Sequence, residues 1–134
     1  MSLNNPRPGL GFVPEYQVSS WPFVTSSNLA TAGTIHRHDF PGVTRWISIH
    51  NNESSGASKT LCVSFSLNGF KPGVSNFYQL HAGEQTSRWE FKCTSLFLSA
   101  SHDNVAYSLA AGYTSIDTDQ FPILSSSNGF LGVG

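Results

Sequence analysis

Hydrophobic and polar residues alternate in short runs from residue 44 to residue 109, and no stretch has the spacing of an amphipathic helix. The clearest run is residues 60–67, in which the apolar side chains of Leu61, Val63, Phe65 and Leu67 share one face of an extended chain. The cysteine and serines between them fall on the other face. This two-residue period is typical of a half-buried β-strand, which needs a sheet partner. The pattern predicts an all-β domain.

Turn residues divide the chain into further apolar runs of strand length. Glycine, asparagine, aspartate and proline gather between these runs, for example in residues 51–58, 68–75 and 101–104. The strand candidates are residues 16–18, 21–25, 34–38, 43–50, 60–67, 76–80, 89–98, 105–110 and 121–124. The spacing of these eight or nine strands suits a sandwich or a closed barrel. We predict a single antiparallel jelly roll, or a closely related two-sheet β-sandwich, with essentially no helix.

The candidate strand 89–98 changes face part-way along. In a single strand, the side chains of Trp89, Phe91 and Cys93 would point to one face, whereas those of Leu96 and Leu98 would point to the other. Either a β-bulge near residues 94–95 or burial of the strand on both sides would explain the change. Six residues are predicted to lie in the core of the domain: Leu61, Val63, Phe65, Leu67, Phe91 and Leu109.

The chain of 134 residues is long enough for one domain with one core. Residues 1–14 contain several prolines and glycines without any periodicity, and they are predicted to form an extended N-terminal arm. Residues 15–127 are expected to form the jelly-roll domain. Residues 128–134 are expected to form a glycine-rich C-terminal tail.

Charged residues make up only 11% of the chain, less than half of the usual share, whereas aromatic residues make up 13%. A surface of hydroxyl and amide groups indicates either an assembly surface covered by other protein or an extracellular, lectin-like β domain. The net charge of −1, with scattered basic residues, argues against nucleic-acid binding. No apolar run approaches the roughly 20 residues that cross a bilayer, and residues 1–12 do not resemble a signal peptide. Neither membrane insertion nor conventional export is therefore expected.

Four phrases in the second half of the chain carry a resemblance to a known family. They are FYQLHAG at residues 77–83, WEFKCTSLFL at 89–98, YSLAAGYTSI at 107–116 and FPILSSSNGF at 121–130. Together they resemble the single jelly-roll penton, or vertex, proteins of large icosahedral double-stranded DNA viruses whose major capsid proteins are double jelly rolls. The resemblance implies a structural virion protein whose homopentamer closes each five-fold vertex of the capsid.

The resemblance also implies partners and a location. Besides its own copies, the subunit would contact the neighbouring major capsid protein and minor capsid proteins, at the capsid vertex, after assembly in the host cell cytoplasm. It implies no catalysis and no cofactor. The low charge favours a ring in which one flank of each subunit meets the opposite flank of the next. The N-terminal arm would reach the adjoining capsid protein.

Two groups of side chains could in principle support chemistry. His36 and His38 would share one face of a strand and, with Asp39, could supply three metal ligands. No further ligand is apparent, so hydrogen-bonded histidines are the simpler interpretation and we predict no metal site. A metal-dependent enzyme of the cupin type is the least favoured alternative. Glu84 and Glu90 could form a carboxylate pair for glycoside hydrolysis, but exposed ion pairs explain them more simply, and we predict no enzymatic activity.

Aromatic residues support a second class of function. The three tryptophans and four tyrosines are Trp21, Trp46, Trp89, Tyr16, Tyr78, Tyr107 and Tyr113. They could form a sugar-stacking platform, although core packing is the simpler interpretation, and Trp46 is the best candidate for an exposed ring. The alternative function is therefore a carbohydrate-binding or host-attachment β-sandwich module of a minor capsid or spike protein. Cys62 and Cys93 are predicted to be free thiols, with Cys93 buried.

Overall fold

A computed structural model describes residues 20–54 and 57–134 of the chain. These residues form an all-β fold, as predicted, and their only helical pieces are three short 3₁₀ turns. The strands are β1 (Trp21–Leu29), β2 (Ile35–Asp39), β3 (Thr44–Asn51), β4 (Leu61–Ser64), β5 (Tyr78–Leu80), β6 (Ser95–Ala100) and β7 (Val105–Tyr113). Within this part of the chain, no helix is long and apolar enough to cross a membrane. The predicted arm, residues 1–14, and the strand candidate 16–18 lie outside the described residues.

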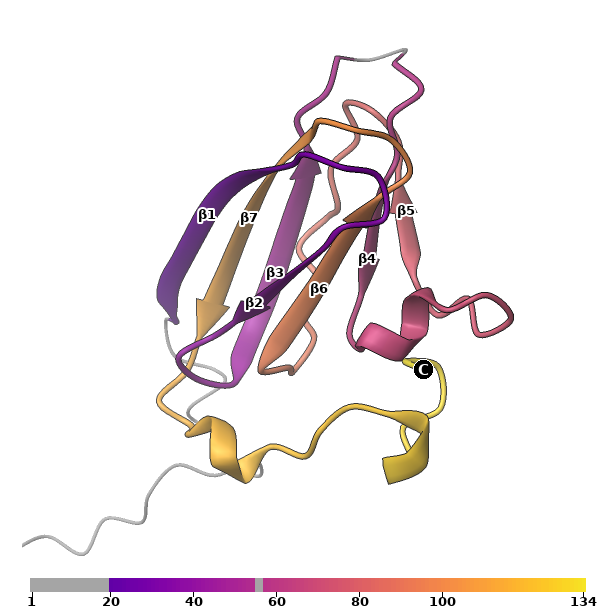
Figure 1. Ribbon diagram of the computed structural model, residues 1–134. Helices are drawn as coiled ribbons and strands as arrows, with labels where there is room; N and C mark the ends of the chain where they lie inside the picture. Colours follow the sequence, from indigo (N-terminus) through magenta and orange to yellow (C-terminus); the bar gives the residue numbers. More distant parts are fainter. Residues whose placement is uncertain (1–19, 55–56) are drawn as a thin grey trace, which may run out of the picture.

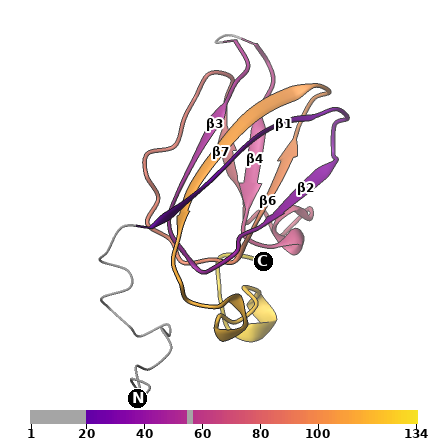
Figure 2. The same ribbon diagram turned by 90° about the vertical axis from the view of Figure 1, so that its left-hand side faces the viewer.

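The strands form two antiparallel sheets that face each other (Figure 1). The first sheet has the order β1-β7-β3 and the second has the order β2-β6-β4-β5. The strands β1 to β4 alternate between the two sheets, so the chain crosses from one layer to the other at each of these connections. Figure 2 shows the two layers from the side. This is the two-sheet β-sandwich that the alternating pattern predicted.

The segment that precedes β6 lies along the free edge of β3 and completes the first sheet. The amide of Ile47 donates a hydrogen bond to the carbonyl oxygen of Trp89 at 2.7 Å, and the amide of Trp89 donates back at 2.8 Å. Similar backbone bonds join Asn51 to Glu84 and Thr44 to Cys93. With residues 84–93 as an irregular fourth strand, each sheet has four strands. The order β1-β7-β3-(84–93) facing β2-β6-β4-β5 is that of an eight-stranded jelly roll.

The change of face within residues 89–98 follows from this arrangement. Trp89 pairs with the first sheet, whereas Leu96 and Leu98 belong to β6 in the second sheet. The prediction of one uninterrupted strand is therefore wrong. The chain leaves the first sheet after Cys93 and enters the second sheet at Ser95. This crossing, rather than a bulge within one strand, changes which positions point to the core.

The core lies between the inner faces of the two sheets. Its fully buried side chains include Leu29, Ile47, Ile49, Leu61, Leu96, Leu98, Val105, Tyr107 and Leu109. Burial of each leucine or isoleucine contributes about 1.5–3 kcal/mol to stability. The predicted core residues Leu61, Val63 and Leu109 are confirmed, and Phe65 is partly buried against the core. Leu67 and Phe91 are 55% and 48% exposed, so their predicted burial is wrong.

The reason for the exposure of Leu67 is that β4 ends at Ser64, three residues earlier than predicted. Ser66 caps a 3₁₀ turn, η1 (Leu67–Phe70), because its side-chain oxygen accepts a hydrogen bond from the amide of Gly69. The extended two-residue period stops there. Phe91 lies on the irregular edge segment, where its ring packs against Phe65 and Trp89 and stays exposed on its other side.

The chain after β7 passes beneath the sandwich and ends against η1 (Figure 1). The 3₁₀ turns η2 (Thr118–Gln120) and η3 (Ser126–Asn128) interrupt it. The predicted strand 121–124 is wrong, since these residues pair with neither sheet and Pro122 has no amide to donate. The glycine-rich end folds back: the side-chain amide of Asn68 donates to the carbonyl oxygen of Gly134 at 3.3 Å.

Candidate functional site

The two histidines of β2 lie on its inner face, as the alternation predicted. Nδ1 of His36 is 2.9 Å, and Nε2 of His38 is 2.6 Å, from the hydroxyl oxygen of Tyr107. Tyr107 belongs to β7 in the opposite sheet and is fully buried. The prediction that these histidines are hydrogen bonded is confirmed. The resulting His36–Tyr107–His38 cluster ties the edge of the second sheet to the first sheet across the sandwich.

Burial sets the protonation state of this cluster. It lowers the pKa of His38 below the ordinary value, and the neighbouring His36 lowers that pKa further, against the opposing effect of Asp39. Burial also raises the pKa of Tyr107, although a hydrogen bond with Ser27 works in the other direction. Both effects favour the neutral forms of His38 and Tyr107 at neutral pH.

Asp39 does not join the two histidines. It lies on the exposed face of β2, where its carboxylate accepts hydrogen bonds from Nε of Arg37 at 2.8 Å and from the hydroxyl of Ser95 at 2.6 Å. The bond from Ser95, followed by that from Arg37, lowers the pKa of Asp39. Among residues 20–54 and 57–134, no three His, Cys, Asp or Glu side chains come together. The three-ligand set of His36, His38 and Asp39 is therefore not formed.

The two glutamates singled out from the sequence also lie apart. The carboxylate of Glu84 accepts a hydrogen bond from the amide of His81 at 2.7 Å. Glu90 forms an ion pair with Arg88 at 2.6 Å, which lowers the pKa of Glu90. Glu84 is hydrogen bonded to Asn51, whereas Trp89, the neighbour of Glu90, pairs with Ile47. Ile47 and Asn51 are about 13 Å apart along β3. The two carboxylates therefore do not share one site.

Aromatic side chains meet on the flank formed by β5 and residues 84–93. The rings of Tyr78 and Trp89 are perpendicular with centroids 5.1 Å apart, and Trp89 and Phe91 are 5.6 Å apart. Tyr78 is 56% exposed. These rings line a groove of about 380 Å³, here called the aromatic groove, together with Val63, Phe65, Ser75, Asn76, Phe77 and Gly132. None of the described residues that line it is charged.

Trp46 is not the exposed aromatic residue that the sequence predicted. It is half-buried, and its ring nitrogen Nε1 donates a hydrogen bond to the hydroxyl oxygen of Ser20 at 3.0 Å. Gly112 makes room for this contact, because a Cβ atom at Gly112 would lie 2.2 Å from Nε1 of Trp46. Trp21 is the most exposed tryptophan, at 63%, and packs edge-on against Tyr113.

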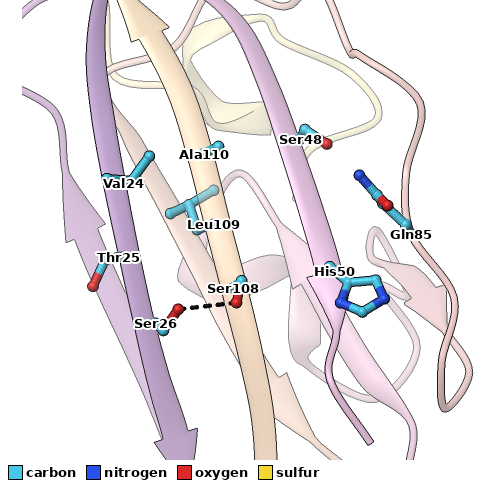
Figure 3. A pocket seen from close by; sticks show the side chains of 9 residues that line it. All are labelled: Val24, Thr25, Ser26, Ser48, His50, Gln85, Ser108, Leu109 and Ala110. Atoms are coloured by element: carbon cyan, nitrogen blue, oxygen red, sulfur yellow. Dashed lines mark hydrogen bonds between the residues drawn. The ribbon is translucent and has the colours of Figure 1, made fainter.

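A second hollow, also of about 380 Å³, lies on the outer face of the first sheet (Figure 3). Its floor is the central strand β7, which contributes Ser108 and Ala110 between the side chains of β1 and β3. The hydroxyls of Ser26 and Ser108 are hydrogen bonded at 2.9 Å. Among the described residues of its lining, His50 is the one titratable side chain. This described lining offers hydrogen-bonding groups but no pair of groups for acid–base chemistry.

The two thiols lie in different surroundings. Cys93 is buried, as predicted, and burial raises its pKa to about 11. Cys62 is half-buried in β4, and burial raises its pKa as well. Neither cysteine is in a disulfide, and neither thiol is activated as a nucleophile.

Sequence reasoning missed Tyr107 as the shared partner of the two histidines. The available signal was its position, because Tyr107 shares one face of the strand with Val105 and Leu109 and therefore points inward. The alternation pattern did not reveal that β7 and β2 face each other across the core. The aromatic groove was missed for the same reason: Tyr78 and Trp89 are distant in sequence and meet only in the folded sandwich.

Comparison with known proteins finds no match to a protein family, a curated protein or a solved structure. The fold itself defines the class of protein. The chain is a jelly-roll β-sandwich with a polar cluster between its sheets and an aromatic groove on one flank.

Proposed function

We propose that this protein is a structural virion protein, a penton subunit whose homopentamer closes the five-fold vertices of an icosahedral capsid. The observation that carries the proposal is the presence of two exposed apolar surfaces on opposite flanks of the jelly roll. Its further partners would be the neighbouring major capsid protein and minor capsid proteins. It would lie at the capsid vertex after assembly in the host cell cytoplasm.

The first surface, here called the β1 flank, lies on the edge strand of the first sheet. Trp21 is 63% exposed on one face of this strand, and Val24 is 73% exposed on the other. The aromatic groove lies at the other edge of the sandwich, where Tyr78 and Phe91 are 56% and 48% exposed. Figure 1 shows β1 and β5 on opposite sides of the molecule. Contiguous exposed apolar patches mark interaction surfaces, and we take these two flanks as the candidates.

Two different apolar surfaces are what a closed ring requires. In a head-to-tail ring each subunit presents one surface to the subunit before it and another surface to the subunit after it. The low content of charged residues, 11% of the chain, supports the same function, because subunits can make contact without burying unpaired charges in the interface. The ring size of five rests on the resemblance to penton proteins.

The test is to measure the mass of the assembled protein and to disrupt each flank separately. Sedimentation and native mass spectrometry of the purified chain are expected to give a pentamer. Val24→Ser on the β1 flank and Phe91→Ser in the aromatic groove are each expected to give monomers. An equimolar mixture of the two variants is expected to give dimers, because each variant retains the surface that the other lacks.

Leu131→Ser serves as the control, because Leu131 is 88% exposed but belongs to neither flank. This variant is expected to remain pentameric. If the unmodified chain stays monomeric at high concentration, and if imaging of the particle shows it away from the five-fold axes, the proposal is wrong.

Glycan binding is the second candidate function, and the uncharged aromatic groove favours it. Perpendicular faces of Tyr78 and Trp89 provide a surface for the apolar face of a neutral sugar, beside the amide of Asn76. In a glycan array, binding by a monomeric protein that is lost in Trp89→Ala and kept in Trp21→Ala would favour this function over assembly.

A further inference from the structure

The His36–Tyr107–His38 cluster brings three atoms that can ligate a metal into contact. Both ring nitrogens lie within 2.9 Å of the same hydroxyl oxygen, so the three possible donors are already neighbours. The donors come from β2 and β7, which belong to different sheets. The side chains of both histidines are half-buried, so the cluster is reached from solvent on the β2 side.

The spacing of these donors is close to that of a metal site. In a tetrahedral zinc site with bonds of about 2.0–2.1 Å, neighbouring donor atoms are about 3.3 Å apart. The nitrogens of His36 and His38 are 2.9 Å and 2.6 Å from the tyrosine oxygen. These two nitrogen–oxygen distances therefore have to lengthen by about 0.4–0.7 Å to match the donor spacing of such a site, which small side-chain rotations in an edge strand can provide.

We propose that His36, His38 and Tyr107 form a binding site for a divalent transition-metal ion such as Zn²⁺. The hydrogen-bonded cluster described above is its metal-free state. The site joins β2 to β7, so a bound ion links the two sheets on the flank that carries β1 and β2. The inference is independent of the proposed assembly.

The chemistry of the donors selects the class of ion. Two imidazoles and one phenol oxygen suit Zn²⁺, Cu²⁺ or Ni²⁺, whereas Mg²⁺ and Ca²⁺ prefer carboxylate and carbonyl oxygens. The nearest carboxylate along β2, that of Asp39, is on the other face and is held by Arg37 and Ser95. Ser27, which hydrogen bonds to Tyr107, is positioned to orient the phenol.

The test uses the full chain, freed of metal by a chelator and titrated with zinc chloride. Isothermal titration calorimetry is expected to show one ion bound per chain with micromolar or tighter affinity. The unfolding temperature is expected to rise with zinc concentration, because the ion binds the folded state only. Magnesium chloride at the same concentrations is expected to leave the unfolding temperature unchanged.

Variants locate the site. His36→Gln and His38→Gln are each expected to abolish both effects of zinc. The matched control, a triple variant with His50→Gln, His81→Gln and His102→Gln, removes the other histidines and is expected to retain both effects. Because Tyr107→Phe alters a buried position, its folding is verified by circular dichroism before its expected weaker zinc affinity is measured.

Cobalt provides a second measurement that does not depend on stability. Co²⁺ bound at the cluster is expected to give visible absorption that is lost in His38→Gln and kept in the triple variant. Zinc binding that survives in both His36→Gln and His38→Gln would mean adventitious surface binding and would overturn the proposal. The absence of binding at micromolar zinc would overturn it as well.

Discussion

Replacing Thr44 with valine is expected to loosen the segment that completes the first sheet. Thr44 is fully buried at the start of β3. Its hydroxyl donates to the carbonyl oxygen of Phe91 at 2.7 Å and accepts from the amide of Cys93 at 2.9 Å. Valine keeps the size and the branching of the side chain but can form neither hydrogen bond. The change therefore isolates two of the hydrogen bonds that join residues 84–93 to β3 and leaves the backbone bonds in place.

The magnitude follows from the two backbone groups that lose their partner. Each buried, unsatisfied group costs about 1–3 kcal/mol, and the additional methyl group of valine recovers about 1 kcal/mol. The expected loss in the free energy of unfolding is therefore about 1–5 kcal/mol, with a midpoint of about 3 kcal/mol. For a domain of this size, that corresponds to a decrease of about 10 °C in the unfolding temperature.

Urea unfolding followed by tryptophan fluorescence measures this loss, and hydrogen exchange at the amide of Cys93 reports where it occurs. Exchange at this amide is expected to accelerate in Thr44→Val more than exchange in β7. Thr118→Val, at an exposed residue in η2, is the control and is expected to change the free energy of unfolding by less than about 0.5 kcal/mol. If Thr44→Val is as stable as this control, the hydrogen bonds do not hold the segment and the reasoning is refuted.

Three further predictions concern pH, packing and thiol reactivity. Because the pKa of His38 is lowered in the folded protein, folding disfavours its protonation, and stability is expected to fall as the pH drops below about 6.5. The urea midpoint is expected to decrease less between neutral and acidic pH in His38→Gln than in the unmodified protein. An equal decrease in both proteins would contradict the assignment of this pH dependence to His38. A Cβ atom at Gly42 would lie 2.2 Å from the carbonyl oxygen of Thr114, so Gly42→Ala is expected to lower the unfolding temperature by several degrees. A thiol reagent at mildly alkaline pH is expected to modify Cys62 before Cys93, whose burial raises its pKa to about 11; mass mapping that finds Cys93 first would disprove this.

Alternation and turn chemistry predict much of this fold because a strand with one buried face has apolar residues at every second position. The region around β3 shows this clearly, since Ile47 and Ile49 alternate with half-buried residues and both are in the core. The same logic placed His36 and His38 on one face of a strand. It was wrong at Leu67 because a serine cap, rather than hydrophobicity, ends β4.

The sequence alone therefore determined the fold class, most of the strands and the inward face of strands such as β2, β3 and β4. It could not determine which strands face each other, because the alternation of one strand contains no information about residues in the opposite sheet. Only the tertiary structure brought Tyr107 to the two histidines and Tyr78 to Trp89. Both sites join side chains that are distant in sequence, and their geometry depends on how the two sheets pack.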